Sequence, residues 1–203
     1  YPYPDVKFDD RSEVIDAIQY YVKNKSSNGI VLFGAYSLGK AQELVKIINQ
    51  VDIVPAVGSK ISKFNRVYGS FGIDLKYETE GEGKSFEELV AQSGVGIVEN
   101  QMLAEAASKM AAMSNRRVFT AVATGFAKFF KFNTSVQFPL SDHADFSQAL
   151  EYLQRTEPKI VYAIGKGSER MAKSLSGKGY EAHSANSSYG FFSMETLKAS
   201  LER

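Results

Sequence analysis

Apolar side chains recur along the chain with two different spacings, and the change from one to the other predicts successive helices and strands. Residues 10–25 carry apolar positions at helical spacing, with Ser12 as the expected N-cap. The continuous apolar run 30–33 is typical of a strand buried on both faces, and a glycine-bearing loop leads from it into a helix at 41–50. This part of the chain therefore predicts a helix followed by a strand–loop–helix unit.

Strands and helices continue to alternate after residue 50. The expected elements are a strand at 51–57, a helix at 61–71, an acidic, glycine-broken loop at 78–83, a short helix at 86–90, a strand at 94–98, a helix at 102–113 and a strand at 117–123. Strands that alternate with helices form a mostly parallel sheet with helices on both faces. We therefore predict an α/β fold with this architecture.

The remaining residues continue the pattern in shorter elements. An apolar run at 136–140 precedes a helix at 146–154, for which Asp145 is the expected N-cap. His183 lies in a serine- and asparagine-rich stretch and is expected at the surface. The other expected elements are a strand at 159–164, a helix at 168–175, a short strand at 180–182 and a closing helix at 194–201.

Composition narrows the class of protein without deciding its function. With 203 residues, 44% of them hydrophobic and 23% charged, the chain is long enough for one domain, or one domain with an appendage. It has no cysteine, which excludes disulfides and thiolate zinc sites, and no apolar run approaches the roughly 18 residues of a spanning helix, so we expect a cytoplasmic protein. A net charge of +1 leaves nucleic-acid binding open, because phosphate binding needs only a local patch.

Residues 126–132 interleave phenylalanines with Lys128 and Lys131. Such a stretch can stack bases while its lysines neutralise phosphates, as in proteins that bind single strands. The alternative, and the commoner use of such a pattern, is a hairpin that packs the rings into the core. The sequence leaves both interpretations open.

The strongest candidate for chemistry is the polar turn within Phe138–Phe146, where His143 lies beside Asp142 and two residues before Asp145. An imidazole flanked by carboxylates can be held in one tautomer and can act as a general acid. A capped turn with a satisfied polar histidine is the alternative interpretation.

A second motif runs from Gly34 to Lys40 and matches the G-x-x-x-x-G-K spacing of a P-loop, in which backbone N–H groups and the lysine bind phosphates. Ala41 stands where the motif needs a Ser or Thr hydroxyl for magnesium. A tight strand-to-helix turn explains the same residues without a nucleotide, so the P-loop nucleotide binder is the weaker hypothesis.

Two stretches resemble the β-CASP family of metallo-β-lactamase-fold nucleases, which includes mRNA 3′-end processing factors and exonucleases. In that family a Ser-x-His-x-Asp turn is followed by a helix and then by a Pro-Lys-x-Val strand that ends in a zinc-binding His-Gly pair. The turn at Ser141–Asp145 and the strand at Pro158–Gly165 match this order, and His143 falls on the first histidine. Gly165 stands where the zinc-binding histidine would be.

The resemblance implies roles for residues in three places. His143 would be the general acid or transition-state hydrogen-bond donor, and Asp145 would orient it. Asp142, directly before His143, would be the third catalytic candidate. The loop that carries Ser37, Gly39 and Lys40 would lie near the active-site cleft and bind a substrate phosphate. The Thr124–Gly125 turn would help to position the scissile strand.

The resemblance also implies that this chain is only the second half of a complete enzyme. Residues 10–138 would be the β-CASP cassette, and residues 139–203 the carboxy-terminal segment that returns to the metallo-β-lactamase fold. The His-x-His-x-Asp-His motif that binds zinc in a complete family member is absent, and two histidines cannot build such a site. We therefore expect no metal site in this chain alone and no nuclease activity without the missing half.

Two hypotheses for function follow. The chain is part of a zinc-dependent phosphodiesterase that processes RNA or DNA, or it is a degenerate, non-catalytic RNA-binding or scaffold protein. The strand Ile160–Ile164 is apolar throughout, so we expect it to be covered by the cassette's own helices or by another chain. The partner would be a complementary metallo-β-lactamase half, and self-association is expected in its absence.

Overall fold

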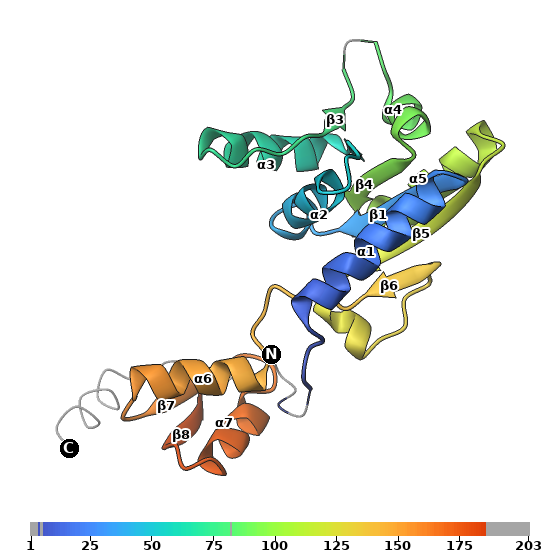
Figure 1. Ribbon diagram of the computed structural model, residues 1–203. Coiled ribbons are helices and arrows are strands. Elements are labelled where there is room, and N and C mark those ends of the chain that lie inside the picture. The colour runs from blue at the N-terminus through green and yellow to red at the C-terminus, as the bar shows by residue number, and fades with distance from the viewer. Residues whose placement is uncertain (1–3, 5, 82, 186–203) are drawn as a thin grey trace. The chain divides into compact units, whose positions relative to one another are not determined.

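The computed structural model describes residues 4, 6–81 and 83–185. The chain forms two compact units, each described here by itself. The larger unit runs from Phe8 to Asp142, and the smaller unit contains the described residues up to Lys7 and from His143 onward. Figure 1 labels the helices and strands of both units.

The larger unit is built around a six-stranded sheet in which every pairing is parallel. The strand order is β3-β2-β4-β1-β5-β6. The strands are β1 (Gly29–Ala35), β2 (Ala56–Val57), β3 (Glu78–Thr79), β4 (Val95–Glu99), β5 (Arg117–Ala123) and β6 (Val136–Phe138). Strand β1 is buried along its whole length between β4 and β5, as its unbroken apolar run predicts.

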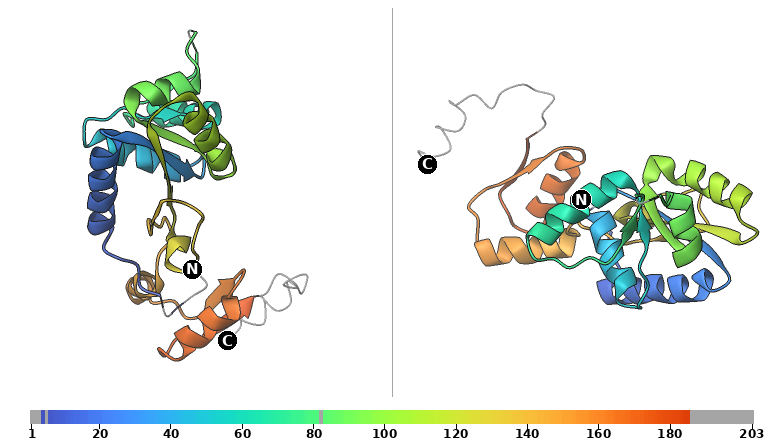
Figure 2. Two further views of the ribbon diagram at one scale, coloured as in Figure 1. Left: turned by 90° about the vertical axis from the view of Figure 1, so that its right-hand side faces the viewer. Right: turned by 90° about the horizontal axis from the view of Figure 1, so that it is seen from above.

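Helices cover both faces of this sheet, as Figure 2 shows from above. Apolar residues of α1 (Arg11–Ser26), α2 (Lys40–Asn49) and α3 (Ser59–Ser70) form one core with β1 residues such as Phe33. Residues of α4 (Phe86–Ser93) and α5 (Leu103–Met113) form a second core with the alternate β1 residues Ile30 and Leu32. The prediction of a largely parallel α/β fold with helices on both faces is therefore confirmed.

The neighbouring strands β1 and β4 are followed by helices on opposite faces of the sheet. Strand β1 leads into α2 on one face, whereas its neighbour β4 leads through a short 3₁₀-helix, η1 (Asn100–Met102), into α5 on the other. Ligands of open α/β sheets bind in the crevice that forms at such a point. We therefore expect a ligand site near the residues that follow β1, β4 and β5.

The smaller unit contains a two-stranded parallel sheet, β7 (Val161–Ile164) and β8 (Ala182–Ala185), connected through α7 (Ser168–Ser176). Its other described helix is α6 (Phe146–Thr156), whose N-cap is Asp145 as predicted. The Asp145 carboxylate accepts a hydrogen bond from the Gln148 N–H at 2.9 Å and one from the Ser147 hydroxyl at 2.7 Å. No described residue of α6 is fully buried, although its apolar face is half-covered.

The predicted strand at 51–57 is wrong in extent, because only Ala56 and Val57 pair. Asp52 has a left-handed φ of 59°, and the Asn49 side chain donates to the Ile53 carbonyl at 3.0 Å, so the chain turns here before it enters the sheet. The predicted N-cap is also wrong: Asp10 caps α1 by accepting from the Ser12 N–H at 2.7 Å.

The cover expected over residues 160–164, by the cassette's helices or by another chain, stays a prediction. Strand β7 alternates between half-buried and exposed positions, with Tyr162 42% and Ile164 75% exposed. His183 is exposed as expected, but it has a carboxylate nearby, since its Nε2 lies 3.5 Å from Glu181 Oε1. The predicted closing helix at 194–201 lies outside the described residues. None of the described helices is long and apolar enough to cross a membrane.

Candidate functional site at the carboxyl edge of the sheet

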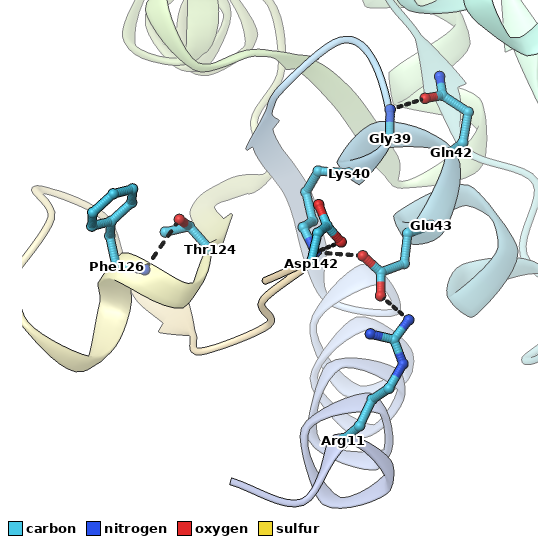
Figure 3. A network of polar contacts seen from close by, with 8 residues as sticks. All are labelled: Arg11, Gly39, Lys40, Gln42, Glu43, Thr124, Phe126 and Asp142. Atoms are coloured by element: carbon cyan, nitrogen blue, oxygen red, sulfur yellow. Dashed lines mark hydrogen bonds and ion pairs between the residues drawn. The ribbon is translucent and has the colours of Figure 1, made fainter. Parts of the chain in front are cut away.

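A charged cluster joins the start of α2 to the chain that follows β6 (Figure 3). Lys40 is 3% exposed, and its ammonium donates to Asp142 Oδ1 at 2.7 Å and to Glu43. The other Glu43 oxygen pairs with Arg11 from α1. The two positive and two negative charges thus neutralise one another in a partly buried cluster. This cluster connects α1, α2 and the end of the larger unit.

Lys40 affects the titration of both carboxyl groups. Burial opposes ionisation of Asp142, but the hydrogen bond and charge of Lys40, helped by the hydrogen bond with Glu43, hold the pKa of Asp142 below its ordinary value. Burial raises the pKa of Glu43, against the lowering by Lys40 and Arg11, and the hydrogen bond with Asp142 adds to the rise. A proton bound by this pair is therefore held preferentially by Glu43.

This geometry opposes the P-loop interpretation of residues 34–40. The Lys40 charge is neutralised inside the protein, whereas a P-loop lysine must reach the terminal phosphates. The Gly39 N–H donates to Gln42 Oε1 at 2.7 Å, and the Gln42 amide donates to the Ser37 carbonyl at 3.1 Å. The loop is therefore occupied by internal hydrogen bonds, as expected of the tight strand-to-helix turn.

The predicted Thr124–Gly125 turn begins a second 3₁₀-helix, η2 (Gly125–Lys128). The Thr124 hydroxyl caps η2 by accepting from the Phe126 N–H at 3.3 Å (Figure 3). Gly125 is required by a close approach, because a Cβ there would lie 2.7 Å from the Ser141 hydroxyl oxygen. The turn thus fixes where the following aromatic residues emerge.

Residues 125–135, here called the aromatic loop, connect β5 to β6 without forming the hairpin that was one interpretation of the sequence. Gln137 of β6 holds the loop by three hydrogen bonds: its amide donates to the carbonyls of Ala127 at 2.9 Å and Phe130 at 3.0 Å, and its carbonyl accepts from the Phe132 N–H at 2.9 Å. At its far end the loop is tied to β5, since Thr120 and Ser135 exchange backbone-to-hydroxyl hydrogen bonds of 3.1 Å.

A cavity of about 530 Å³ lies between the aromatic loop, β5 and the start of α5. Its aromatic lining includes Tyr36, which is 60% exposed, and Phe130, which is 53% exposed. The lining residues, none of them charged, are Tyr36, Asn100, Leu103, Ala104, Thr120, Val122, Thr124, Phe126, Phe130, Phe132, Asn133 and Thr134. Tyr36 follows β1 and Asn100 follows β4, so the cavity opens where the topology predicts a ligand.

A shallower hollow of about 460 Å³ lies against the same loop and is lined partly by Lys128 and Lys131. Lys128 forms an ion pair with Asp9, whereas Lys131 is exposed. Phe130 and Phe132 line both hollows. The aromatic loop therefore has uncharged lining toward one cavity and two lysines toward the other.

The predicted catalytic residues are divided between the two units. Asp142 closes the larger unit in its ion pair with Lys40, whereas His143 and Asp145 belong to the smaller unit. His143 is exposed, and the Asp145 carboxylate is buried at the start of α6.

The described residues do not fit a zinc ion, because they contain no group of three or more His, Cys, Asp or Glu side chains that could hold a metal. Gly165 has a φ of 92°, a conformation that favours glycine, so this position has a backbone reason for lacking a histidine.

Sequence reasoning missed Tyr36, Asn100 and Gln137. Tyr36 and Asn100 come directly after the observed strands β1 and β4, two or three residues beyond the ends of the strands predicted at 30–33 and 94–98. The rule that ligands bind at the carboxyl ends of parallel strands could therefore have found them. Gln137 could not be found in this way, since its three partners lie in the aromatic loop, whose path the sequence does not predict.

The larger unit is thus an open parallel α/β domain with a ligand-sized cavity at its carboxyl edge. No protein-family model matches the chain. A protein described as "Probable DNA ligase" from Opitutus terrae (strain DSM 11246 / JCM 15787 / PB90-1) is 30% identical to it over 156 residues. The aligned stretch is 75% of this chain but 14% of that protein, so the chain spans a small part of its relative's length.

Replacing Lys40 by alanine should destabilise the protein. The change leaves Glu43 and the half-exposed Asp142 without their shared cation, and we expect the free energy of unfolding to fall by about 2–4 kcal/mol. Urea denaturation measures it, with Lys46→Ala on the exposed side of α2 as the control, expected within about 0.5 kcal/mol of wild type. Equal stability of the two variants would show that Lys40 has no structural role.

Replacing Gln137 by leucine should loosen the aromatic loop. The three hydrogen bonds disappear, and we expect a loss of about 1–3 kcal/mol together with faster hydrogen exchange at the Phe132 amide. Gln92→Leu, at an exposed position of α4, is the matched control and should leave exchange in the loop unchanged. Unchanged protection of Phe132 in Gln137→Leu would contradict this account of the loop.

Proposed function

We propose that this chain is part of a nucleic-acid-processing enzyme and binds a single strand of DNA or RNA at the carboxyl edge of the larger unit. The observation that carries the proposal is the aromatic loop, which places an uncharged aromatic cavity beside a hollow lined by Lys128 and Lys131. Proteins that bind single strands combine these two features, since rings stack on bases and cations neutralise phosphates. The similarity to part of a probable DNA ligase supports the same class of substrate.

We further propose that the complete enzyme is a β-CASP-type phosphodiesterase, and that this chain is inactive alone. Because the described residues do not fit zinc, we assign no hydrolytic step to them. His143 is proposed as a general acid within the complete enzyme. Asp145 already accepts two hydrogen bonds at the start of α6, so it would fix the position of the turn that carries His143.

The second candidate is a non-catalytic nucleic-acid-binding or scaffold protein. It is favoured by the left-handed conformation of Gly165, which suits glycine at the position where the nuclease family would have a zinc-binding histidine. Both candidates share the binding surface and differ only in whether a catalytic half completes the protein.

The proposal predicts salt-dependent binding of single strands. A fluorescein-labelled strand of about 15 nucleotides, DNA or RNA, should bind at about 50 mM salt and weaken as salt rises. Lys131→Ala should weaken binding and reduce the slope of log K against log salt by about one, because one phosphate contact is lost. Fluorescence anisotropy measures both.

The control is Lys63→Ala, an exposed lysine on α3, which should leave affinity and slope unchanged. The absence of binding by either strand at about 50 mM salt would overturn the proposal, since electrostatic contacts are strongest there. Equal effects of the two alanine variants would show that binding does not use the aromatic loop.

A further inference from the structure

The cavity beside the aromatic loop has features that the binding of a phosphate backbone does not require. A backbone site needs cations, yet none of the residues that line the cavity is charged. The lining combines the rings of Tyr36, Phe126, Phe130 and Phe132 with uncharged amide and hydroxyl groups. Such a lining suits a neutral ligand that has apolar faces and hydrogen-bonding groups.

The polar groups of the cavity come from separate elements. Asn100 follows β4, Thr120 lies on β5, and Asn133 lies on the aromatic loop. Each asparagine amide offers both donors and an acceptor, so it can pair with the edge of a planar heterocycle.

The backbone also makes room for Asn100. A Cβ at Gly34 would lie 3.0 Å from Asn100 Oδ1 and 3.1 Å from Leu103 Cδ2, so glycine at this position lets both lining residues pack closely on β1. The loop is held in place by Gln137 and by the Thr120–Ser135 exchange. The cavity is thus largely pre-formed, which lowers the entropic cost of binding.

We infer that this cavity holds one unpaired nucleobase of the bound strand, while the adjoining phosphates lie toward Lys131. This inference rests on the proposed binding of single-stranded nucleic acid and names the part of the strand that the cavity recognises. The volume of about 530 Å³ falls within the range of small-ligand pockets. Lys131 lies between the cavity-lining Phe130 and Phe132 in the chain, so a base and its neighbouring phosphate can be bound together.

The test compares a base-bearing DNA strand with an abasic strand of the same length, which keeps the phosphates and lacks the bases. Wild-type protein should bind the abasic strand about tenfold or more weakly, because stacking contributes about 1–3 kcal/mol per base. Phe130→Ala should weaken binding of the base-bearing strand by a similar factor and leave the abasic strand unchanged. Tyr36→Ala should also weaken binding of the base-bearing strand. Both side chains are exposed, so we expect the two variants to fold.

The matched control is Phe71→Ala, since Phe71 is 81% exposed at the end of α3 and does not line the cavity. It should change neither affinity. Equal affinity of wild type for the two strands, or equal effects of Phe130→Ala and Phe71→Ala, would overturn the nucleobase site while single-strand binding stands. Failure of both strands to bind would overturn the proposed function and this inference with it.

Discussion

The larger unit depends on the parallel pairing of β1 with β4 on one side and β5 on the other. Side chains of β1 point alternately into the two helix-covered cores, and its backbone hydrogen bonds are satisfied by β4 and β5. The strand is therefore buried along its whole length. The same strand sets the position of the site. Its carboxyl end delivers Tyr36 to the cavity and then starts α2, where Lys40 enters the charged cluster.

The carboxyl edge separates a structural task from a binding task. Lys40, Glu43, Asp142 and Arg11 neutralise one another, so this cluster joins elements and does not present a cation to a ligand. The aromatic loop does present its groups, because exposed rings and Lys131 lie on a backbone held by the side chain of Gln137. In the proposed function, the aromatic loop after β5 therefore binds the strand, although the loop after β1 has the more familiar motif.

The sequence predicted the elements whose pattern is local and continuous. Strand β5 was predicted at its observed bounds, and Asp145 was predicted as the cap of α6. The strand predicted at 51–57 failed because a left-handed turn at Asp52 intervenes, which apolar spacing cannot reveal. The role of Lys40 could not be predicted either, since Asp142 is 102 residues away and meets it only through the fold. The sequence showed that phenylalanines and lysines alternate at residues 126–132. Only the structure shows which of these side chains line each cavity.

The central claim is that the carboxyl edge of the larger unit binds an unpaired strand through the aromatic loop. Amide chemical-shift mapping of ¹⁵N-labelled protein during titration with a short single-stranded oligonucleotide tests it most directly. The account predicts the largest shifts at Tyr36, Asn100 and the residues around Phe130, with the amides near Lys40 little changed. Shifts confined to residues 143–185, or centred on the loop at residues 37–40, would contradict it.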